Sequence, residues 1–272
     1  MIKTNIIYNK DCIEGMKELP NESVDMILCD LPYGVTQNKK DIPLDLNKLW
    51  KQYNRIIKEK GVIILTAQFP YTVELILSQK NIFRYDLIWD KKLTSGFLNA
   101  NRMPLRCHEH ILVFYKKLGT YNPQFETGKP LHSRGVNYKT KKMKNRNYGK
   151  WNYTDDLRKG STEKYPKSII QIQKPHPSKA RHRTEKPVEL AEYLIKTYSN
   201  KEDIILDNCI GTGWTALACK KLNRQFIGYE IDPQYYQVSM DRLNAIEFTQ
   251  GDTPRLRIEM ARIRQEEENY EI

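Results

Sequence analysis

The amino-acid sequence predicts an α/β protein with a doubly wound, mostly parallel sheet. Short apolar runs of strand length alternate with segments of helical spacing over most of the chain. Two of these runs end on an acidic residue, as strands do where a parallel sheet presents its carboxyl edge to a ligand. The chain has 272 residues, of which 39% are hydrophobic, and this suffices for one large domain with a modest insertion.

The first 115 residues carry the clearest alternation. Residues 6–8 and 24–29 are apolar runs that we expect to be strands, and residues 12–19 between them have helical spacing that ends at Pro20. Lys60-Gly61 is expected to separate a helix from the strand that follows it. Beyond Asp30 the pattern predicts helices over residues 45–58 and 70–79 and strands over residues 62–65, 85–89 and 111–115.

The region 116–181 differs from the rest of the chain. It has few apolar runs and no clear period, and its basic residues far outnumber its acidic ones. Aromatic residues such as Tyr138 and Trp151 lie among the basic ones, whereas disordered linkers contain few aromatic residues. We interpret this region as an insertion that contacts nucleic acid, with a disordered linker as the alternative.

Regular alternation returns from residue 182 onward. Residues 187–199 have the amphipathic spacing of a helix, with proline in its first turn. We expect further helices over residues 215–222 and 235–246, strands over residues 203–207 and 226–230, and a charged tail of helical spacing from residue 258. The chain therefore divides into a first half-domain (1–115), the insertion (116–181) and a second half-domain (182–272).

Composition narrows the class of partner. The formal net charge of +12 favours a polyanion such as nucleic acid, although a lysine-rich surface without such a role is an equal alternative. The five cysteines form no CxxC pair, which is typical of reduced cytoplasmic thiols. No apolar run is long enough to span a membrane, and His108-Glu109-His110 lacks metal-site spacing, so we expect neither a membrane anchor nor a metal.

A nucleoside-binding site is predicted after residues 203–207. Gly211-Thr212-Gly213 lets the backbone turn sharply beside a ligand at the start of a helix. Glu230 ends the next strand, where its carboxylate can accept both hydroxyls of a ribose. The third glycine of a dinucleotide fingerprint is absent, which argues against a nicotinamide oxidoreductase.

The second chemical unit is Asp30-Leu31-Pro32-Tyr33, at the expected carboxyl end of the strand 24–29. An exocyclic base amine is a poor nucleophile, because its lone pair is delocalised into the ring. The Asp30 carboxylate and the Leu31 carbonyl can accept hydrogen bonds from such an amine, and the Tyr33 ring can stack on the base. Taken alone, this tetrapeptide is more often an ordinary Pro-Tyr turn with a solvated aspartate.

Together these segments resemble the S-adenosylmethionine-dependent DNA amino-methyltransferases. Asp30-Leu31-Pro32-Tyr33 is similar to the family's (Asp/Asn/Ser)-Pro-Pro-(Tyr/Phe) motif, although Leu31 replaces its first proline. Residues 207–215 resemble its methyl-donor motif Asp-Pro-Phe-x-Gly-Ser-Gly-Thr-Thr, with Asn208-Cys209 in place of Pro-Phe. Residues 182–187 resemble its His-Pro-Thr-Gln-Lys-Pro block, and Asn9-Lys10-Asp11-Cys12, Trp89-Asp90-Lys91 and the segment 106–110 also match.

The resemblance implies a Rossmann-like methyltransferase sheet and a role for each matching residue. The order of catalytic motif, insertion and donor motif is that of the beta class, in which the insertion recognises the target. The catalytic residues would be Asp30, Leu31, Pro32 and Tyr33. S-adenosylmethionine would be bound by Asp11, Cys12, Asp30, His182, Thr184, Lys186, Asp207, Cys209, Gly211, Gly213, Thr215, Glu230 and Ile231. The basic residues that we expect to contact DNA are Lys91, Arg106, Arg134, Lys141, Lys144, Arg146 and Arg158.

An aspartate at position 30 resembles the N6-adenine members of the family more than the N4-cytosine members. The resemblance therefore implies site-specific methylation of adenine N6 in double-stranded DNA after base flipping. Cytosine N4 methylation, an RNA substrate and an inactive nucleic-acid-binding module are the alternatives. The resemblance also implies a cytoplasmic protein of bacterial or phage origin, with a homodimer and a cognate restriction enzyme as further partners.

Overall fold

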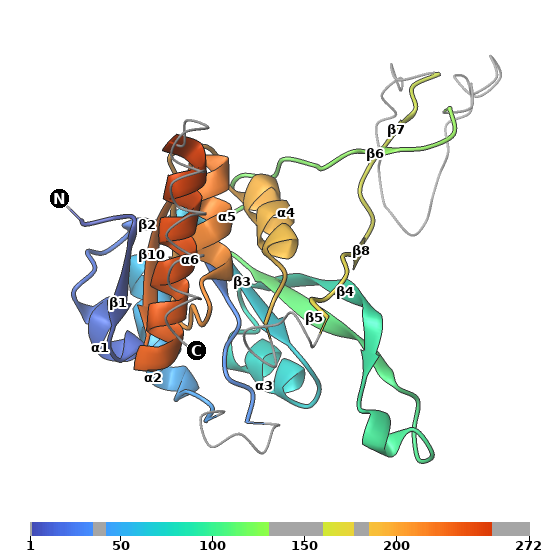
Figure 1. Ribbon diagram of the computed structural model, residues 1–272, viewed down its shortest axis with the longest axis horizontal. Coiled ribbons are helices and arrows are strands. Elements are labelled where there is room, and N and C mark those ends of the chain that lie inside the picture. The colour runs from blue at the N-terminus through green and yellow to red at the C-terminus, as the bar shows by residue number, and fades with distance from the viewer. Residues whose placement is uncertain (1, 35–41, 131–159, 177–184, 252–272) are drawn as a thin grey trace, which may run out of the picture. The chain divides into compact units, whose positions relative to one another are not determined.

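A computed structural model describes residues 2–34, 42–130, 160–176 and 185–251 of the chain. It contains two compact units (Figure 1). The first is made of Met1–Asn122 together with Ser168–Ile272, and the second is Pro123–Lys167. The first unit carries the main sheet, its helices and the described residues of both predicted half-domains.

Among the described residues, eight strands form one sheet in the order β1-β10-β9-β2-β3-β5-β4-β8. Neighbouring strands are parallel, except that β5 is antiparallel to both β3 and β4. This mostly parallel sheet confirms the predicted fold class. The strands are Ile6–Asn9 (β1), Val24–Cys29 (β2), Ile57–Ala67 (β3), Phe83–Ser95 (β4), Arg106–Phe114 (β5), Ile169–Gln171 (β8), Ile204–Asp207 (β9) and Gln225–Glu230 (β10).

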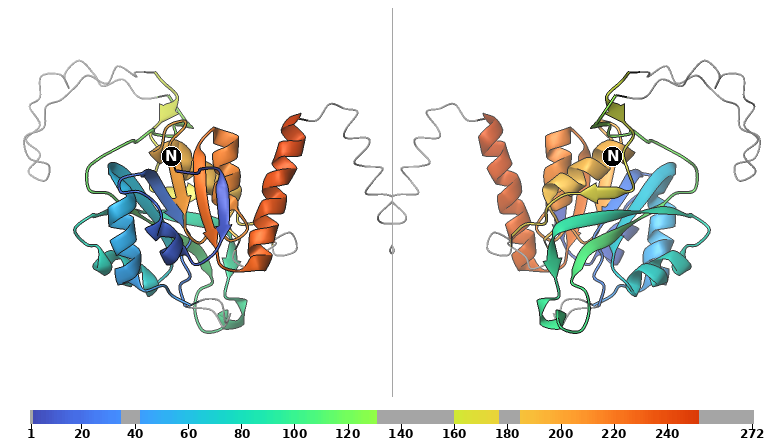
Figure 2. Two further views of the ribbon diagram at one scale, coloured as in Figure 1. Left: turned by 90° about the vertical axis from the view of Figure 1, so that its left-hand side faces the viewer. Right: turned by 90° about the vertical axis from the view of Figure 1, so that its right-hand side faces the viewer.

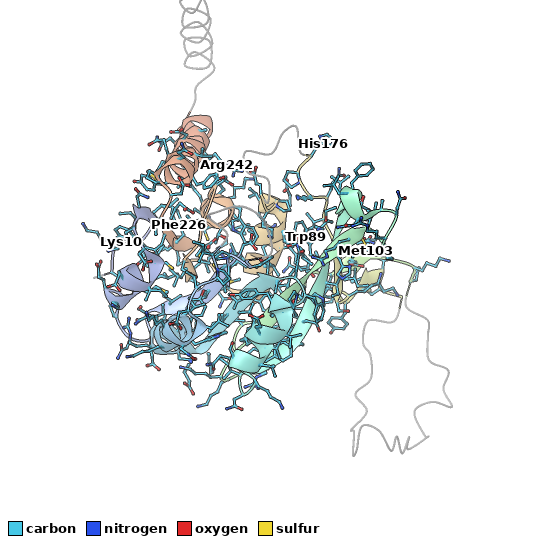
Figure 3. The ribbon with its side chains drawn as sticks, turned by 90° about the horizontal axis from the view of Figure 1, so that it is seen from below. Lys10, Trp89, Met103, His176, Phe226 and Arg242 are labelled. Carbon is cyan, nitrogen blue, oxygen red and sulfur yellow. The ribbon has the colours of Figure 1, made fainter. Side chains whose placement is uncertain are left out.

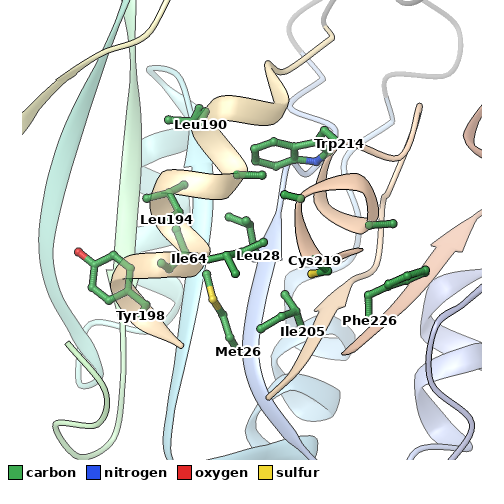
Figure 4. Close-up of a cluster of buried hydrophobic side chains, with 14 of the residues drawn as sticks. Met26, Leu28, Ile64, Leu190, Leu194, Tyr198, Ile205, Trp214, Cys219 and Phe226 are labelled. Atoms are coloured by element: carbon green, nitrogen blue, oxygen red, sulfur yellow. The ribbon is translucent and has the colours of Figure 1, made fainter. Parts of the chain in front are cut away.

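Helices cover both faces of the sheet (Figure 2). One face carries α1 (Cys12–Lys17), α2 (Leu46–Ile56) and α3 (Tyr71–Ser78), and the other carries α4 (Val188–Tyr198), α5 (Trp214–Leu222) and α6 (Pro233–Gly251). The two hydrophobic clusters that hold these layers use alternate residues of the same strands. Met26 and Leu28 of β2 belong to the cluster with α4 and α5 (Figure 4), whereas Ile27 and Cys29 belong to the other cluster.

The helix starts follow from the sequence. Asp45 caps α2, because its carboxylate accepts hydrogen bonds from the backbone N–H groups of Asn47 and Lys48. Asp11 caps α1 in the same way, with Glu14 as the donor. The helices start and end within a few residues of the predicted bounds, apart from α6, which extends to Gly251.

Two predicted boundaries are wrong. Lys60-Gly61 does not stop a helix but lies inside β3, which begins immediately after α2. Gly61 is required there by packing, since a Cβ atom at this position would lie 2.9 Å from the backbone carbonyl oxygen of Asp25. The stretch predicted to be irregular also contains β8, a short strand that pairs in parallel with β4.

The second unit is described at its two ends. β6 (Glu126–Thr127) pairs with β7 (Glu163–Lys164) in an antiparallel ladder, and the rings of Phe125 and Tyr165 pack 5.1 Å apart. This unit falls inside the predicted insertion, whose bounds and role stay predictions. Within the described residues of the whole chain, no helix is long and apolar enough to cross a membrane.

Candidate functional site

The predicted catalytic tetrapeptide lies at the carboxyl edge of the sheet. β2 ends at Cys29, and Asp30 follows it directly. Since β2 pairs in parallel with both β3 and β9, the carboxyl ends of these three strands meet at one edge. Thr66 of β3 and Asp207 of β9 therefore lie on either side of the Asp30 strand. The catalytic tetrapeptide and the methyl-donor motif therefore follow adjacent strands of the sheet.

Both oxygens of the Asp30 carboxylate have partners within the protein. Oδ1 accepts hydrogen bonds from the Tyr33 hydroxyl, at 2.6 Å, and from the Thr66 hydroxyl. Oδ2 accepts a hydrogen bond of 2.6 Å from Lys186 Nζ. The carboxylate is therefore oriented by groups from three separate parts of the chain.

Tyr33 covers this carboxylate with its hydroxyl turned inward. Burial, followed by the nearby Asp30 carboxylate, raises the pKa of Tyr33 well above its ordinary value, so the hydroxyl keeps its proton. The Lys186 ammonium lies 5.6 Å from the centroid of the Tyr33 ring. Leu31 is buried in the core and Pro32 is half-buried, which anchors the turn between Asp30 and Tyr33.

Four buried or half-buried ionic side chains form what we term the charge cluster: Asp30, Lys91, Glu109 and Lys186. Lys186 Nζ lies 2.6 Å from Asp30 Oδ2 and 3.2 Å from Glu109 Oε2. The contact with Glu109 is an ion pair whose geometry is not that of a hydrogen bond. Glu109 Oε1 in turn lies 3.3 Å from Lys91 Nζ. The cluster thus links the loop after β2 to the strands β4 and β5.

Opposite charges within the cluster shift the pKa values of Glu109 and Lys186. Burial by itself would raise the pKa of Glu109, but the ammonium groups of Lys186 and Lys91 bring it below its ordinary value. Burial would lower the pKa of Lys186, but the carboxylates of Asp30 and Glu109 raise it above its ordinary value. Glu109 and Lys186 are therefore charged at neutral pH.

One residue of the cluster lies elsewhere than its predicted role suggests. Lys91 was expected to contact DNA, but it is only 1% exposed and its ammonium faces Glu109. A side chain buried in this way is not available to a phosphate, so the expectation for Lys91 is corrected. The ammonium of Lys186 pairs with Asp30 and Glu109, and its expected place beside the methyl donor stays a prediction.

The glycine loop, residues 208–213, connects β9 to α5. Asp207 lies at its start and is fully buried, with Oδ1 accepting a hydrogen bond from the Cys209 backbone N–H at 3.1 Å. Oδ2 accepts a hydrogen bond from the Thr215 hydroxyl at 2.6 Å. Gly211 and Gly213 have φ angles of 55° and 86°, which favour glycine. Asp207 and Thr215 therefore brace the loop from beneath.

Burial raises the pKa of Asp207 to about 7, although hydrogen bonds from Thr215 and from the Cys209 backbone lower it. Among the described residues, no cation forms an ion pair with this carboxyl that would offset the cost of removing it from water. Asp207 thus differs from Asp30, which pairs with Lys186.

Glu230 braces the other side of the glycine loop. Its Oε2 accepts a hydrogen bond from the Gly211 backbone N–H at 2.9 Å, and its Oε1 accepts one from the Asp232 backbone N–H at 2.8 Å. Burial raises its pKa, and these two backbone donors oppose that rise. Ile231 beside it is 68% exposed, and a Cβ atom at Gly211 would meet nothing within 4 Å. The loop therefore has open space beside a carboxylate and an exposed apolar side chain.

Asp11 and Cys12 lie close to this loop, because β1 pairs with β10 so that Asn9 is opposite Glu230. Cys12 is buried, and Asn208 Nδ2 lies 3.6 Å from its sulfur and 3.5 Å from the sulfur of Cys209. Asn208 Oδ1 accepts a hydrogen bond from the Tyr53 hydroxyl of α2. Asn208, at a position where the resemblance predicts proline, thus ties the loop to α1 and α2.

Arg242 of α6 joins the segment of Lys186 to the glycine loop (Figure 3). Its guanidinium lies 3.0 Å from Glu185 Oε1 and donates a hydrogen bond of 2.6 Å to the Thr212 carbonyl. Glu185 and Lys186 therefore connect the glycine loop to the charge cluster through neighbouring positions of the chain.

Several predicted site residues lie outside the described residues. They are His182, Thr184, Arg134, Lys141, Lys144, Arg146 and Arg158. Arg106 is described and exposed at the start of β5, where its guanidinium donates a hydrogen bond to the Gln68 side chain. Within the described residues, no group of three or more His, Cys, Asp or Glu side chains could hold a metal ion.

Sequence reasoning missed the roles of Thr66 and Glu109. Thr66 is one of several apolar or small residues at the end of β3, and nothing in its neighbours distinguishes it. Glu109 offered a signal, since it lies in a strand next to the apolar run 111–114, where a buried acidic residue needs a partner. That partner, Lys186, is 77 positions away in sequence and could be found only from the fold.

Comparisons with known proteins agree with this geometry. Residues 24–241 match the family described as DNA methylase, which covers N6 and N4 methyltransferases. The chain is 26% identical over 271 residues to the Type II methyltransferase M1.MboII of Moraxella bovis, covering 91% of this chain and 99% of that protein. It is 24% identical over 252 residues to the DNA adenine methyltransferase YhdJ of Escherichia coli K12, covering 88% and 82% of the two chains.

Two solved structures share the fold. The crystal structure of M1.HpyAVI in complex with SAM has a TM-score of 0.59 and 24% sequence identity, covering 88% of this chain and 98% of that one. The cytosine-N4-specific PvuII DNA methyltransferase has a TM-score of 0.62 and 15% identity, covering 88% and 86% of the two chains. At these identities the likeness concerns the fold.

Proposed function

Because this chain belongs to the N6/N4 DNA methylase family, we propose that it transfers a methyl group from S-adenosylmethionine to the N6 amine of adenine in double-stranded DNA. The observation that carries the proposal is the position of Asp30. This carboxylate lies at the sheet edge beside the glycine loop and is oriented by Tyr33, Thr66 and Lys186. A fixed acceptor next to a nucleoside-sized site is what amine methylation requires.

The charge cluster suits Asp30 to act as an acceptor. A neutral base amine is far too weak an acid for a carboxylate to deprotonate it before attack. The amine instead needs to donate hydrogen bonds, so that its nitrogen can rehybridise while it attacks. Asp30 Oδ1 and the Leu31 carbonyl would accept those two bonds. Lys186 on Oδ2 holds the carboxylate in its orientation for this role.

Tyr33 has to give up its hydrogen bond to Asp30 when the base enters. In the structure its hydroxyl occupies Oδ1, the oxygen that the amine would use. We expect the ring to move over the base and stack on it, while Thr66 keeps its hydrogen bond to the same oxygen. Because the base amine replaces the Tyr33 hydroxyl as hydrogen-bond donor, the carboxylate stays hydrogen-bonded throughout.

The residues around the glycine loop fit S-adenosylmethionine. Glu230 can accept hydrogen bonds from ribose hydroxyls, and exposed Ile231 can pack on a purine ring. The side of Gly211 where a Cβ atom would meet nothing within 4 Å is where we propose that the nucleoside packs. When bound, this donor supplies a methyl group on a positively charged sulfonium. We propose Asp11, Cys12 and Cys209 as further contacts of the donor, whereas His182 and Thr184 lie outside the described residues.

The transfer is a direct displacement that balances without a covalent enzyme intermediate. The amine nitrogen forms a bond to the methyl carbon as the bond from that carbon to sulfur breaks, and sulfur leaves as a neutral thioether. The positive charge passes to the amine, beside the Asp30 carboxylate, which stabilises it. The amine then loses one proton, which Asp30 can accept and pass to water.

The choice of adenine rests on Asp30 and on the resemblance described above. The relative YhdJ is named as an adenine methyltransferase, whereas the PvuII enzyme of the same fold is named as cytosine-N4-specific. Both amines would make the same hydrogen bonds to Asp30 and Leu31. Cytosine N4 is therefore the second candidate, and the reaction product separates the two.

Recognition of the DNA sequence would fall to the basic insertion. The unit Pro123–Lys167 and the basic residues around it are where we propose base and phosphate contacts, with Arg106 as a further contact. The relative M1.MboII is a Type II methyltransferase, which supports a role beside a cognate restriction enzyme in a bacterial cell. Homodimer formation is part of the same proposal.

Methyl-labelled S-adenosylmethionine and unmethylated genomic DNA test the proposal. After incubation with the purified protein, the DNA is digested to nucleosides, which are separated. Label in N6-methyladenosine would support the proposal, and sequencing of the product would then reveal the site. Label in N4-methylcytosine would overturn the choice of base and leave the mechanism at Asp30 intact. A parallel incubation with total RNA completes the test, and label in that RNA with none in DNA would overturn the substrate class.

A further inference from the structure

The hairpin between β4 and β5 exposes large apolar side chains at its end. We term residues 96–105 the hairpin tip, which Figure 1 shows extending beyond the helix-covered part of the sheet. Phe97 is 80% exposed, Leu98 is 93% exposed and Met103, labelled in Figure 3, is 57% exposed. Exposing side chains of this size forgoes the free energy that their burial would contribute.

The tip is a built structure and not a frayed loop. A short 3₁₀ helix, Phe97–Asn99, follows Gly96, whose φ of 85° turns the chain out of β4. The backbone N–H of Arg102 donates to the Asn99 carbonyl at 2.8 Å, and the Ser95 hydroxyl donates to the Arg106 carbonyl at 3.1 Å. These bonds fix the backbone from which Phe97 and Leu98 project into solvent.

Positive charge surrounds the apolar tip. No Asp or Glu occurs in residues 91–108, whereas Lys92, Arg102 and Arg106 are all exposed there. The positive charge would repel a second copy of the same tip. An apolar partner would leave these basic side chains without a counter-charge. A nucleic acid duplex offers both phosphates for the basic residues and a stack of apolar base faces for the tip.

The tip also shares its strands with the candidate catalytic site. Lys91 on β4 and Glu109 on β5 belong to the charge cluster around Asp30. Phe97 is six positions beyond Lys91, so the two residues lie at most roughly 20 Å apart. The exposed apolar tip therefore projects from the same hairpin that carries Lys91 and Glu109 of the charge cluster.

A base that reaches Asp30 has to leave the duplex, and its departure opens a gap in the stack. We propose that Phe97 and Leu98 enter that gap and hold it open while the target base is bound at Asp30. Arg102 and Lys92 would bind the flanking phosphates. This inference rests on the proposed function, because only a flipped base leaves such a gap.

The test compares the wild-type protein with the double variant Phe97→Ala/Leu98→Ala on two duplexes that carry the mapped target site. In one duplex the target base is paired, and in the other it lies opposite an abasic position that already leaves it unpaired. Leu77→Ala is the matched control, because Leu77 is an exposed leucine of α3, outside the residues proposed to contact DNA. Methyl transfer is measured as kcat/KM, and thermal unfolding and sedimentation are recorded for each protein.

We expect the double variant to lose on the order of 10- to 100-fold in kcat/KM on the paired duplex, since unstacking costs a few kcal/mol. On the abasic duplex it should come within about threefold of the wild type, because less base pairing has to be broken. The control should match the wild type on both duplexes. All three proteins should unfold at the same temperature and sediment alike.

Equal activity of the double variant and the wild type on the paired duplex would overturn the inference, and so would an equal loss on both duplexes. A change from dimer to monomer in the double variant would instead identify a second copy of this chain as the partner of the tip. A wild-type protein that methylates neither duplex would remove the proposed function, and the inference with it. Normal wild-type transfer with an unaffected double variant overturns the inference alone.

Discussion

The charge cluster and the glycine loop present carboxylates at the same sheet edge but hold them in different ways. In the charge cluster, Lys186 bridges Asp30 and Glu109, so the carboxylates are balanced by ammonium groups from distant parts of the chain. At the glycine loop, Asp207 and Glu230 accept hydrogen bonds from local backbone N–H groups and a threonine hydroxyl. One region is held by charge, and the other by short-range hydrogen bonds.

This difference suits two tasks. A carboxylate that stabilises a charge developing during transfer has to be fixed, and the Lys186 ammonium holds the Asp30 carboxylate in place. A loop that binds a nucleoside has to keep its shape, and the hydrogen bonds that its backbone donates to Asp207 and Glu230 preserve it. Variants at the two regions should therefore fail in different ways.

The largest effect is expected from Glu109→Gln. This change removes the carboxylate between Lys91 and Lys186 and leaves two buried ammonium groups with Asp30 as their remaining counter-charge. We expect a loss of about 3–5 kcal/mol in the free energy of unfolding. Urea unfolding measures it, with Glu14→Gln as the control, since the exposed pair of Glu14 and Lys17 should contribute at most ~0.5 kcal/mol. Equal free energies of unfolding for the two variants would show that the charge cluster does not stabilise the fold.

The glycine loop should show a pH dependence that comes from Asp207. Its pKa is raised to about 7 from an ordinary value of 3.8, so its contribution to stability is complete below pH 4 and is lost as the pH rises through 7. Relative to Asp207→Asn, the wild type should lose roughly 3 kcal/mol of unfolding free energy between pH 4 and pH 7. Urea unfolding of both proteins across this range measures the difference, and parallel curves would contradict it.

The substitution Thr66→Val should change the rate of methyl transfer without changing the binding of S-adenosylmethionine. The substitution keeps the shape of the side chain and removes the hydroxyl that donates to Asp30. A hydrogen bond to a charged group contributes about 1.5–3 kcal/mol, so we expect kcat to fall about 10- to 100-fold. The dissociation constant of S-adenosylmethionine, measured by calorimetry, should not change. Weaker binding of S-adenosylmethionine with an unchanged transfer rate would contradict the assignment of Thr66 to Asp30 and would assign it to the glycine loop.

The smallest effect is expected from Ile231→Ala at the glycine loop. Most of this side chain is exposed, so its loss should leave the unfolding free energy unchanged. Packing of the purine ring on Ile231 should contribute about 1 kcal/mol to binding. The loss of this contribution should weaken the affinity for S-adenosylmethionine about fivefold. Calorimetric titration measures the change, with transfer at saturating donor as the control. A fall in that saturated rate would contradict the separation of the two regions.

The sequence predicted the glycine loop better than it predicted the charge cluster. Asp207, Gly211 and Glu230 lie within one βαβ segment, so their spacing alone brings them together. Asp30 was equally visible, because it directly follows an apolar strand. The partners of Asp30 were not, since nothing within β3 distinguishes Thr66 and Lys186 lies 156 positions away in the chain.

The remaining differences have similar causes. β8 was missed because a three-residue strand gives no periodic signal, and its pairing with β4 is what stabilises it. Lys91 was expected to contact DNA because a basic residue is usually exposed. Its burial depends on Glu109, which lies on the neighbouring strand.

The most direct test of this account is Asp30→Ala, studied by single-turnover methyl transfer and donor titration on the same protein sample. We expect this variant to bind S-adenosylmethionine within about twofold of the wild-type affinity, because the glycine loop is unchanged. We expect its transfer rate to fall at least ~100-fold, because the base amine loses the carboxylate that accepts its hydrogen bond. A transfer rate equal to that of the wild type, with the donor bound, would contradict the role of Asp30.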